Sequence, residues 1–168
     1  MNKIFAALCA AVIIGLGAFT LFSPATNPAP TFQLSDLKGQ NISNANLTDK
    51  VTLINFWFPT CPGCVSEMPK LIKMAHDYQG KDFQIIGIAV PTTNPADSLD
   101  GVKNYVAKAQ IPFQVMFDAD KSTVSQFVKN ELYPTSVLIN KRGEVLKTFV
   151  GEPDFAALYQ EVNAELAK

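Results

Sequence analysis

The hydrophobic pattern divides the chain into one continuous apolar segment and a mixed remainder. Residues 4–22 are apolar except at three positions: Gly15, Gly17 and Thr20. As a helix, this segment would span about 28 Å, close to the thickness of the hydrocarbon core of a bilayer. The run is longer than the apolar core of a cleaved signal peptide. We therefore expect residues 1–22 to form an uncleaved membrane anchor. Cleavage after Ala25 is the alternative, and either way the rest of the chain crosses the membrane.

Three prolines within residues 23–30 predict a stiff, extended linker. The folded domain is therefore expected to cover residues 31–168. Its pattern predicts, in chain order, a hairpin (31–43), a strand (51–58), a helix (62–79), a strand (83–90), a helix (from Ser98 or Asp100 to 109), a strand (113–117), a short helix (122–129), two strands (135–140 and 144–150) and a last helix (153–167). This alternation predicts an α/β three-layer sandwich with helices on both faces of its sheet.

Composition narrows the possible chemistry. The 168 residues carry a net charge of −1, which gives no support to nucleic-acid binding. Three cysteines are too few for a disulfide-rich scaffold or for a zinc site with four cysteine ligands, and we expect no metal site. Cys9 lies within the apolar segment, so Cys61 and Cys64 remain as a single pair in the domain.

The spacing of this pair predicts redox chemistry. Cys61 and Cys64 follow a buried strand and open a helix, which distinguishes a redox CxxC from half of a zinc site. At a helix N-terminus, unpaired N–H groups and the helix dipole stabilise the Cys61 thiolate, the attacking species in disulfide exchange. Cys64 lies one turn later and is able to resolve a mixed disulfide. Pro62 suits the first helical position. Gly63 has no side chain, so a partner chain can approach the cysteines closely.

The segment 55–69 resembles the active-site segment of the thioredoxin-like superfamily. More narrowly, it is similar to the membrane-anchored thiol–disulfide oxidoreductases of the TlpA/ResA/CcmG type, in which Asn55 and an E-x-P motif at Glu67 and Pro69 are typical. The resemblance implies a thioredoxin-like three-layer α/β/α sandwich, with a mixed central sheet and an added N-terminal β-hairpin. Thr60 departs from the pattern, because Trp usually precedes the first cysteine.

The resemblance also implies roles for the neighbours of the cysteine pair. Glu67 would exchange a proton with Cys64, whereas the alternative is an acid that only complements the helix dipole. Tyr133 and Pro134 would be joined by a cis peptide bond facing the CxxC and would bind substrate. Trp57, at the end of the central strand, is expected to be a packing residue that shields the sulfurs, and it would also line the surface that receives a partner.

These features predict an extracytoplasmic thiol–disulfide oxidoreductase that reduces disulfides of exported proteins, for example in cytochrome c maturation. Its cofactor would be only the redox-active Cys61–Cys64 pair. Its partners would be the disulfide substrate, a membrane-embedded electron donor of the DsbD/CcdA type, and the membrane through residues 4–22. The protein would be a monomer at the outer face of the bacterial cytoplasmic membrane, or soluble in the periplasm if cleaved.

Three alternatives stay open. The same cysteines would serve a disulfide-donating oxidant, which differs from a reductant in its redox potential. A peroxidase of the peroxiredoxin type usually has a threonine three positions before its reactive cysteine, where this chain has Phe58. A copper-handling protein on this fold would bring a histidine to the cysteines, but His76 lies about 18 Å further along the helix.

Overall fold

A five-stranded mixed sheet forms the centre of the computed structural model, which describes residues 27–168. Its strands lie in the order β5-β4-β3-β6-β7. Their bounds are Val51–Trp57 for β3, Phe83–Ala89 for β4, Gln114–Phe117 for β5, Thr135–Ile139 for β6 and Val145–Val150 for β7. The pairs β3–β4 and β4–β5 are parallel, whereas β3–β6 and β6–β7 are antiparallel. The sheet is therefore mixed, as the resemblance implied, with the β6–β7 hairpin as its antiparallel edge.

The central strand β3 is buried along its whole length, which explains its nearly continuous apolar sequence. Successive side chains of a strand point to opposite faces of the sheet. Leu53 and Trp57 therefore join one hydrophobic core, and Ile54 and Phe56 join the other. Asn55 is fully buried and lies on the same face as Trp57, so it is a polar exception within the first core.

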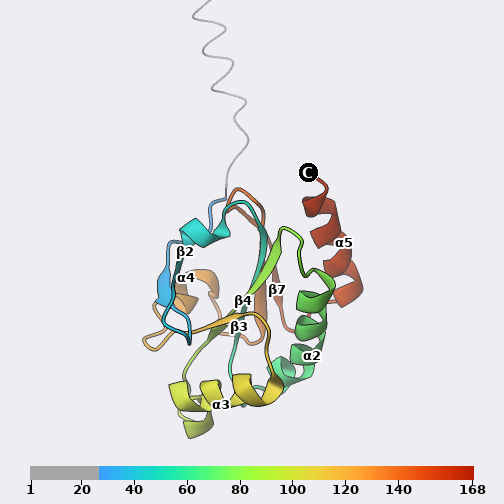
Figure 1. The fold of residues 1–168 in the computed structure, drawn as a ribbon. Helices are drawn as coiled ribbons and strands as arrows, with labels where there is room; N and C mark the ends of the chain where they lie inside the picture. Colours follow the sequence, from blue (N-terminus) through green and yellow to red (C-terminus); the bar gives the residue numbers. More distant parts are fainter. Residues whose placement is uncertain (1–26) are drawn as a thin grey trace, which may run out of the picture.

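Three helices cover the first of these faces: α2 (Pro62–Asp77), α3 (Leu99–Ala109) and α5 (Phe155–Leu166). Figure 1 shows α2 and α5 side by side, and the Tyr78 hydroxyl of the α2 C-cap donates a hydrogen bond to Asn163 of α5. The second face is covered by a shorter set of elements: α4 (Val124–Phe127), the hairpin of β1 (Gln33–Ser35) and β2 (Asn41–Ser43), and the 3-10 helix η1 (Asn44–Leu47). The predicted three-layer architecture and the added hairpin are confirmed.

The described residues that precede Thr31 pair with the folded domain. Asn27 accepts a hydrogen bond from the Val145 N–H, and Ala29 donates one to the Gly143 carbonyl. Residues 27–30, predicted as part of the linker, thus add an extended segment beside the β6–β7 hairpin. Ala29 is buried there, because its small side chain joins the second core. The extended proline-rich backbone that suits a linker suits this pairing equally.

The last helix also starts later than predicted. Asp154 caps α5 by accepting hydrogen bonds from the N–H groups of Ala156 and Ala157, so Pro153 lies before the helix. Within residues 27–168, no helix combines the length and apolar character needed to cross a bilayer. The predicted membrane segment, residues 1–22, and the first half of the predicted linker, residues 23–26, lie outside the described residues.

Candidate active site

Cys61 and Cys64 form a disulfide at the start of α2. Strand β3 ends at Trp57, and the chain then turns so that the Cys61 N–H donates to the Phe58 carbonyl. Cys61 is the N-cap residue of α2, and Pro62 occupies the first turn, where it needs no hydrogen-bond acceptor. The Cα atoms of the two cysteines lie 5.2 Å apart, which one helical turn produces without rearrangement.

The two sulfurs differ in access. Cys61 has 4% of its surface exposed, whereas Cys64 is fully buried. The Cys64 N–H donates to Cys61 Sγ over 3.2 Å, so Cys61 already occupies the position in which helix amides stabilise negative charge. Pro62 is exposed and Gly63 half-buried, and both border the pair. An incoming thiolate or disulfide therefore reaches Cys61 first, while Cys64 lies behind it within disulfide distance.

Glu67 lies beneath the cysteines, one turn after Cys64 on the same face of α2. It is fully buried, and its Oε1 accepts a 2.7 Å hydrogen bond from Asn55 Nδ2. The same amide donates to Ser136 Oγ at 3.0 Å, which links β3, β6 and α2 below the redox pair. Glu67 Oε2 has no hydrogen-bond partner among the described residues. One oxygen of this carboxyl group is thus held, and the other is available to a proton.

Burial raises the pKa of Glu67 from its ordinary value of 4.5 to about 7. The hydrogen bond from Asn55 opposes this rise, because it favours the ionised carboxylate, while the charge of Glu152 adds to it. A group that titrates near neutrality accepts and returns protons at physiological pH. Glu67 therefore has the acid–base character that a proton acceptor for a buried thiol requires.

Pro134 closes the site on the side of Gly63. The Tyr133–Pro134 peptide bond is cis, as the sequence resemblance implied. A Cβ atom on Gly63 would lie 3.0 Å from Pro134 Cδ, so any side chain here would press on the proline ring. Tyr133 is half-buried, and its ring contacts that of Phe58 edge to face at 5.4 Å between centroids. Gly63, Tyr133 and Pro134 are thus gathered beside the disulfide.

Trp57 does not reach the surface, contrary to the prediction that it contacts a partner. It is fully buried, and its ring packs against Tyr105 of α3 with 5.1 Å between centroids. Its Nε1 also lies under Gly87, where a Cβ atom would approach it to 3.2 Å. Because strand side chains alternate, Trp57 points into the first core while its neighbour Phe58 is the one that reaches the site. Trp57 therefore supports the active-site loop from below.

A buried carboxylate that the sequence analysis missed holds the residue before Cys61. Asp97, in the 3-10 helix η2 (Pro95–Asp97), is fully buried. Its Oδ1 accepts the Thr60 N–H at 2.9 Å, and its Oδ2 accepts the Thr60 hydroxyl at 2.6 Å and the Thr92 hydroxyl. Thr60, noted as a departure from the family pattern, thus ties the active-site loop to η2. The only sequence signal was the Asn94-Pro95 turn, which marks a loop without indicating its contact.

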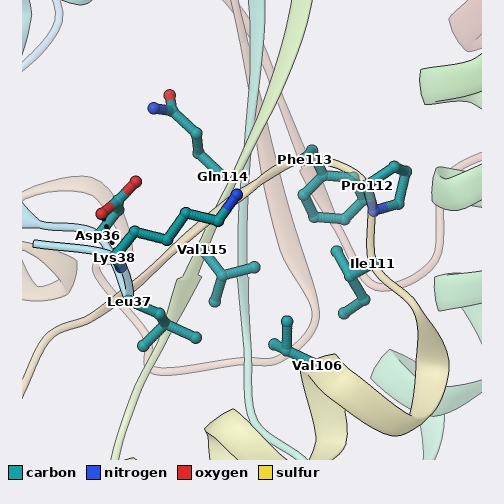
Figure 2. A pocket seen from close by; sticks show the side chains of 9 residues that line it. All are labelled: Asp36, Leu37, Lys38, Val106, Ile111, Pro112, Phe113, Gln114 and Val115. Carbon is teal, nitrogen blue, oxygen red and sulfur yellow. Dashed lines mark hydrogen bonds between the residues drawn. The ribbon is translucent and has the colours of Figure 1, made fainter. Parts of the chain in front are cut away.

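A separate hollow opens at the β5 edge of the sheet, between that strand and the C-terminal part of α3 (Figure 2). Its lining includes Asp36, Lys38, Phe113 and Gln114, and contains neither cysteine nor a chain neighbour of either. Asp36 accepts hydrogen bonds from the N–H groups of Lys38 and Gln40, so its carboxylate stabilises the turn between β1 and β2. This hollow does not belong to the redox site.

The fold and the capped CxxC define a thioredoxin-fold thiol–disulfide oxidoreductase. The family model described as Redoxin matches residues 24–162, and the chain belongs to this family. A curated relative from Bacillus cereus, named thiol-disulfide oxidoreductase ResA, is 33% identical and the match covers 74% of this chain and 68% of the relative. A relative of the same name from Bacillus subtilis is 30% identical, with 80% and 72% covered.

Solved structures agree with this assignment. The solution structure of a candidate thioredoxin from Neisseria meningitidis is 53% identical, with a TM-score of 0.76 over 86% of this chain and 93% of the other. A thiol:disulfide interchange protein of the thioredoxin family from Chlorobium tepidum is 28% identical, with a TM-score of 0.74 over 86% and 99%. The chain is therefore similar to redox proteins over nearly the whole described domain.

Proposed function

We propose that this protein is a reductant of disulfides in exported proteins and acts on the outer side of the bacterial cytoplasmic membrane. Thiol–disulfide exchange at Cys61 and Cys64 is the chemistry of its family. The observation that carries the proposal is the Asn55–Glu67 pair under the cysteines, because Glu67 titrates near neutrality. Such a group favours repeated turnover through a buried Cys64 thiol.

The reaction begins with the reduced protein. The Cys61 thiolate attacks one sulfur of the substrate disulfide, and the other substrate sulfur leaves as a thiolate that takes a proton from water. Cys64 then gives its proton to Glu67, and its sulfur attacks Cys61 Sγ. The second substrate sulfur leaves and is protonated in turn. The substrate disulfide thereby gains two electrons and two protons, and Cys61 and Cys64 are oxidised to the disulfide.

The location and the electron donor are parts of the same proposal. The apolar segment 4–22 supports a tether, or a cleaved export signal, at the membrane. A reductant outside the cytoplasm is oxidised in every cycle, so its disulfide must receive electrons carried through the membrane. A membrane-embedded dithiol donor of the DsbD/CcdA type supplies this chemistry. Cytochrome c maturation is one pathway that requires such a reductant, and another reductive pathway would use it equally.

Exposed apolar side chains near the site support a protein substrate. Val65 follows Cys64 and is 42% exposed, and Leu132 lies two residues before Pro134 and is 54% exposed. Val150 is 63% exposed and precedes Gly151, whose N–H donates to the Pro134 carbonyl. Apolar side chains gathered around a reactive group are typical of a surface that receives another chain. A disulfide-donating oxidant would use the same surface, so the direction of electron transfer depends on the redox potential of the Cys61–Cys64 pair.

Two variants test the proposal by trapping. With Cys64 replaced by Ser, Cys61 still attacks but the mixed disulfide is not resolved. We expect Cys64→Ser, expressed in the native bacterium, to accumulate mixed disulfides with exported proteins in the membrane or periplasmic fraction. The matched control, Cys61→Ser, should trap none of them. The trapped proteins are identified by mass spectrometry. Capture of cytoplasmic proteins alone would contradict the proposed location.

A further inference from the structure

A groove of about 590 Å³ opens directly beside the residue that precedes Cys61. One side is formed by the active-site loop at Pro59 and Thr60 and the other by η2 and one face of α3. The side chains of α3 that line it are Asp100, Asn104, Tyr105 and Lys108. None of these residues takes part in the exchange reaction, and Pro134 lies instead against Gly63.

The Asp97 carboxylate holds the two sides of the groove at a set separation. Asp97 receives both the N–H and the hydroxyl of Thr60, so η2 cannot move away from the active-site loop without breaking two hydrogen bonds. A buried carboxylate left without these donors is strongly destabilising. The groove therefore keeps a constant position relative to Cys61 Sγ.

Two further contacts hold the α3 side. A Cβ atom on Gly101 would lie 2.0 Å from the Ala96 carbonyl oxygen, so the glycine lets η2 pack directly on the first turn of α3. Tyr105 is held from below by the ring of Trp57. A groove whose walls are already ordered binds a chain with a smaller entropy cost than one that forms on binding.

The floor of the groove carries a polar row along α3. Asp100, Asn104 and Lys108 follow one another at intervals of four residues, so they lie on one face of the helix. All three are exposed, and within residues 27–168 Asp100 forms a 3.9 Å ion pair with Lys103. A primary amide has N–H donors and a carbonyl acceptor. These groups can pair with the C=O and N–H groups of an extended peptide main chain.

We propose that this groove binds the stretch of substrate polypeptide next to the cysteine that exchanges with Cys61, with Asn104 hydrogen-bonded to its main chain. The occupant follows from position. During exchange the substrate is covalently joined to Cys61, and the groove begins at Thr60, the residue next to that cysteine. The proposal rests on the disulfide exchange of the proposed function and adds a site that selects protein over small disulfides.

A filling substitution tests the groove. In full-length protein carrying Cys64→Ser, we expect Asn104→Trp to slow the reaction of Cys61 with short peptides whose single cysteine is activated by thionitrobenzoate. Cysteine activated in the same way measures the reactivity of Cys61 itself. The ratio of the two rate constants should fall about tenfold, a change typical of a central contact in an interface. Because the leaving group drives the reaction, the result does not depend on the redox potential of the protein.

Lys103→Trp is the matched control, since Lys103 is exposed on α3 and does not line the groove. Its ion pair with Asp100 is long and solvent-exposed, so its loss should matter little. This control should leave the ratio within about twofold of the unsubstituted value, as expected for a surface substitution. Asn104→Ala, which removes the amide without filling the groove, should lower the ratio by a smaller factor than Asn104→Trp. An unchanged ratio in Asn104→Trp, or an equal fall in Lys103→Trp, would overturn the proposal.

Discussion

Replacing Glu67 with Gln is expected to stabilise the oxidised protein at pH 8 by about 3 kcal/mol and to leave it nearly unchanged at pH 4. The folded protein raises the pKa of Glu67 to about 7, above its ordinary value of 4.5. The contribution of the protonated Glu67 carboxyl to the free energy of unfolding is therefore fully present below pH 4.5. It is lost as the pH rises through 7. Gln stays neutral, so the variant loses no stability over this pH range. Denaturant unfolding across this pH range measures the difference.

Glu161→Gln is the control for this comparison, because Glu161 is a surface acid paired with Lys147. It should change the free energy of unfolding by no more than about 0.5 kcal/mol at any pH in the range. A Glu67→Gln difference that stays constant from pH 4 to pH 8 would show that Glu67 does not titrate near neutrality.

In the reduced protein, the same variant should slow release of substrate from the mixed disulfide by about a hundredfold, because Cys64 loses its proton acceptor.

Removing the Asp97 carboxylate is the second change with a large expected effect. Asp97→Ala should lower the free energy of unfolding by about 3 kcal/mol, because it leaves the Thr60 N–H and two threonine hydroxyls without their acceptor. For a domain of this size, that loss corresponds to a fall in Tm of about 10 °C. Thermal unfolding followed by circular dichroism measures it.

Asp82→Ala is the matched control, since Asp82 is an exposed acid in the turn before β4. Its Tm should stay within about 2 °C of the parent value. If Asp97→Ala proves as mild as Asp82→Ala, Asp97 does not hold the active-site loop, and the argument for a groove with ordered walls fails with it.

Sequence pattern was sufficient for the central features of the fold because they depend on local periodicity. The run at residues 51–58 is apolar on both faces, so it had to be a buried strand, and the spacing of Met68, Leu71 and Ile72 is helical. The position of Cys61 at a helix start followed from these two elements. The resemblance to a known family then implied the cis bond before Pro134, which no local pattern requires.

Long-range contacts were beyond the reach of the pattern. Thr60 and Asp97 are 37 residues apart, and nothing in either segment indicates that they meet. Glu67 and Asn55 were each noted, but their 2.7 Å hydrogen bond became visible only when α2 was packed on β3. Trp57 is the packing residue that the sequence suggested, but it does not line the partner surface, because the end of a strand does not reveal which of two adjacent aromatic residues turns inward.

The equilibrium redox potential of the Cys61–Cys64 couple tests the central claim most directly. Full-length protein is equilibrated in buffers of defined dithiothreitol or glutathione ratio, and the fraction of reduced cysteines is measured after quenching with an alkylating reagent. The proposed reductant should have a potential near that of thioredoxin, about −270 mV. A potential near that of the oxidant DsbA, about −120 mV, would contradict the claim and identify the protein as a disulfide donor.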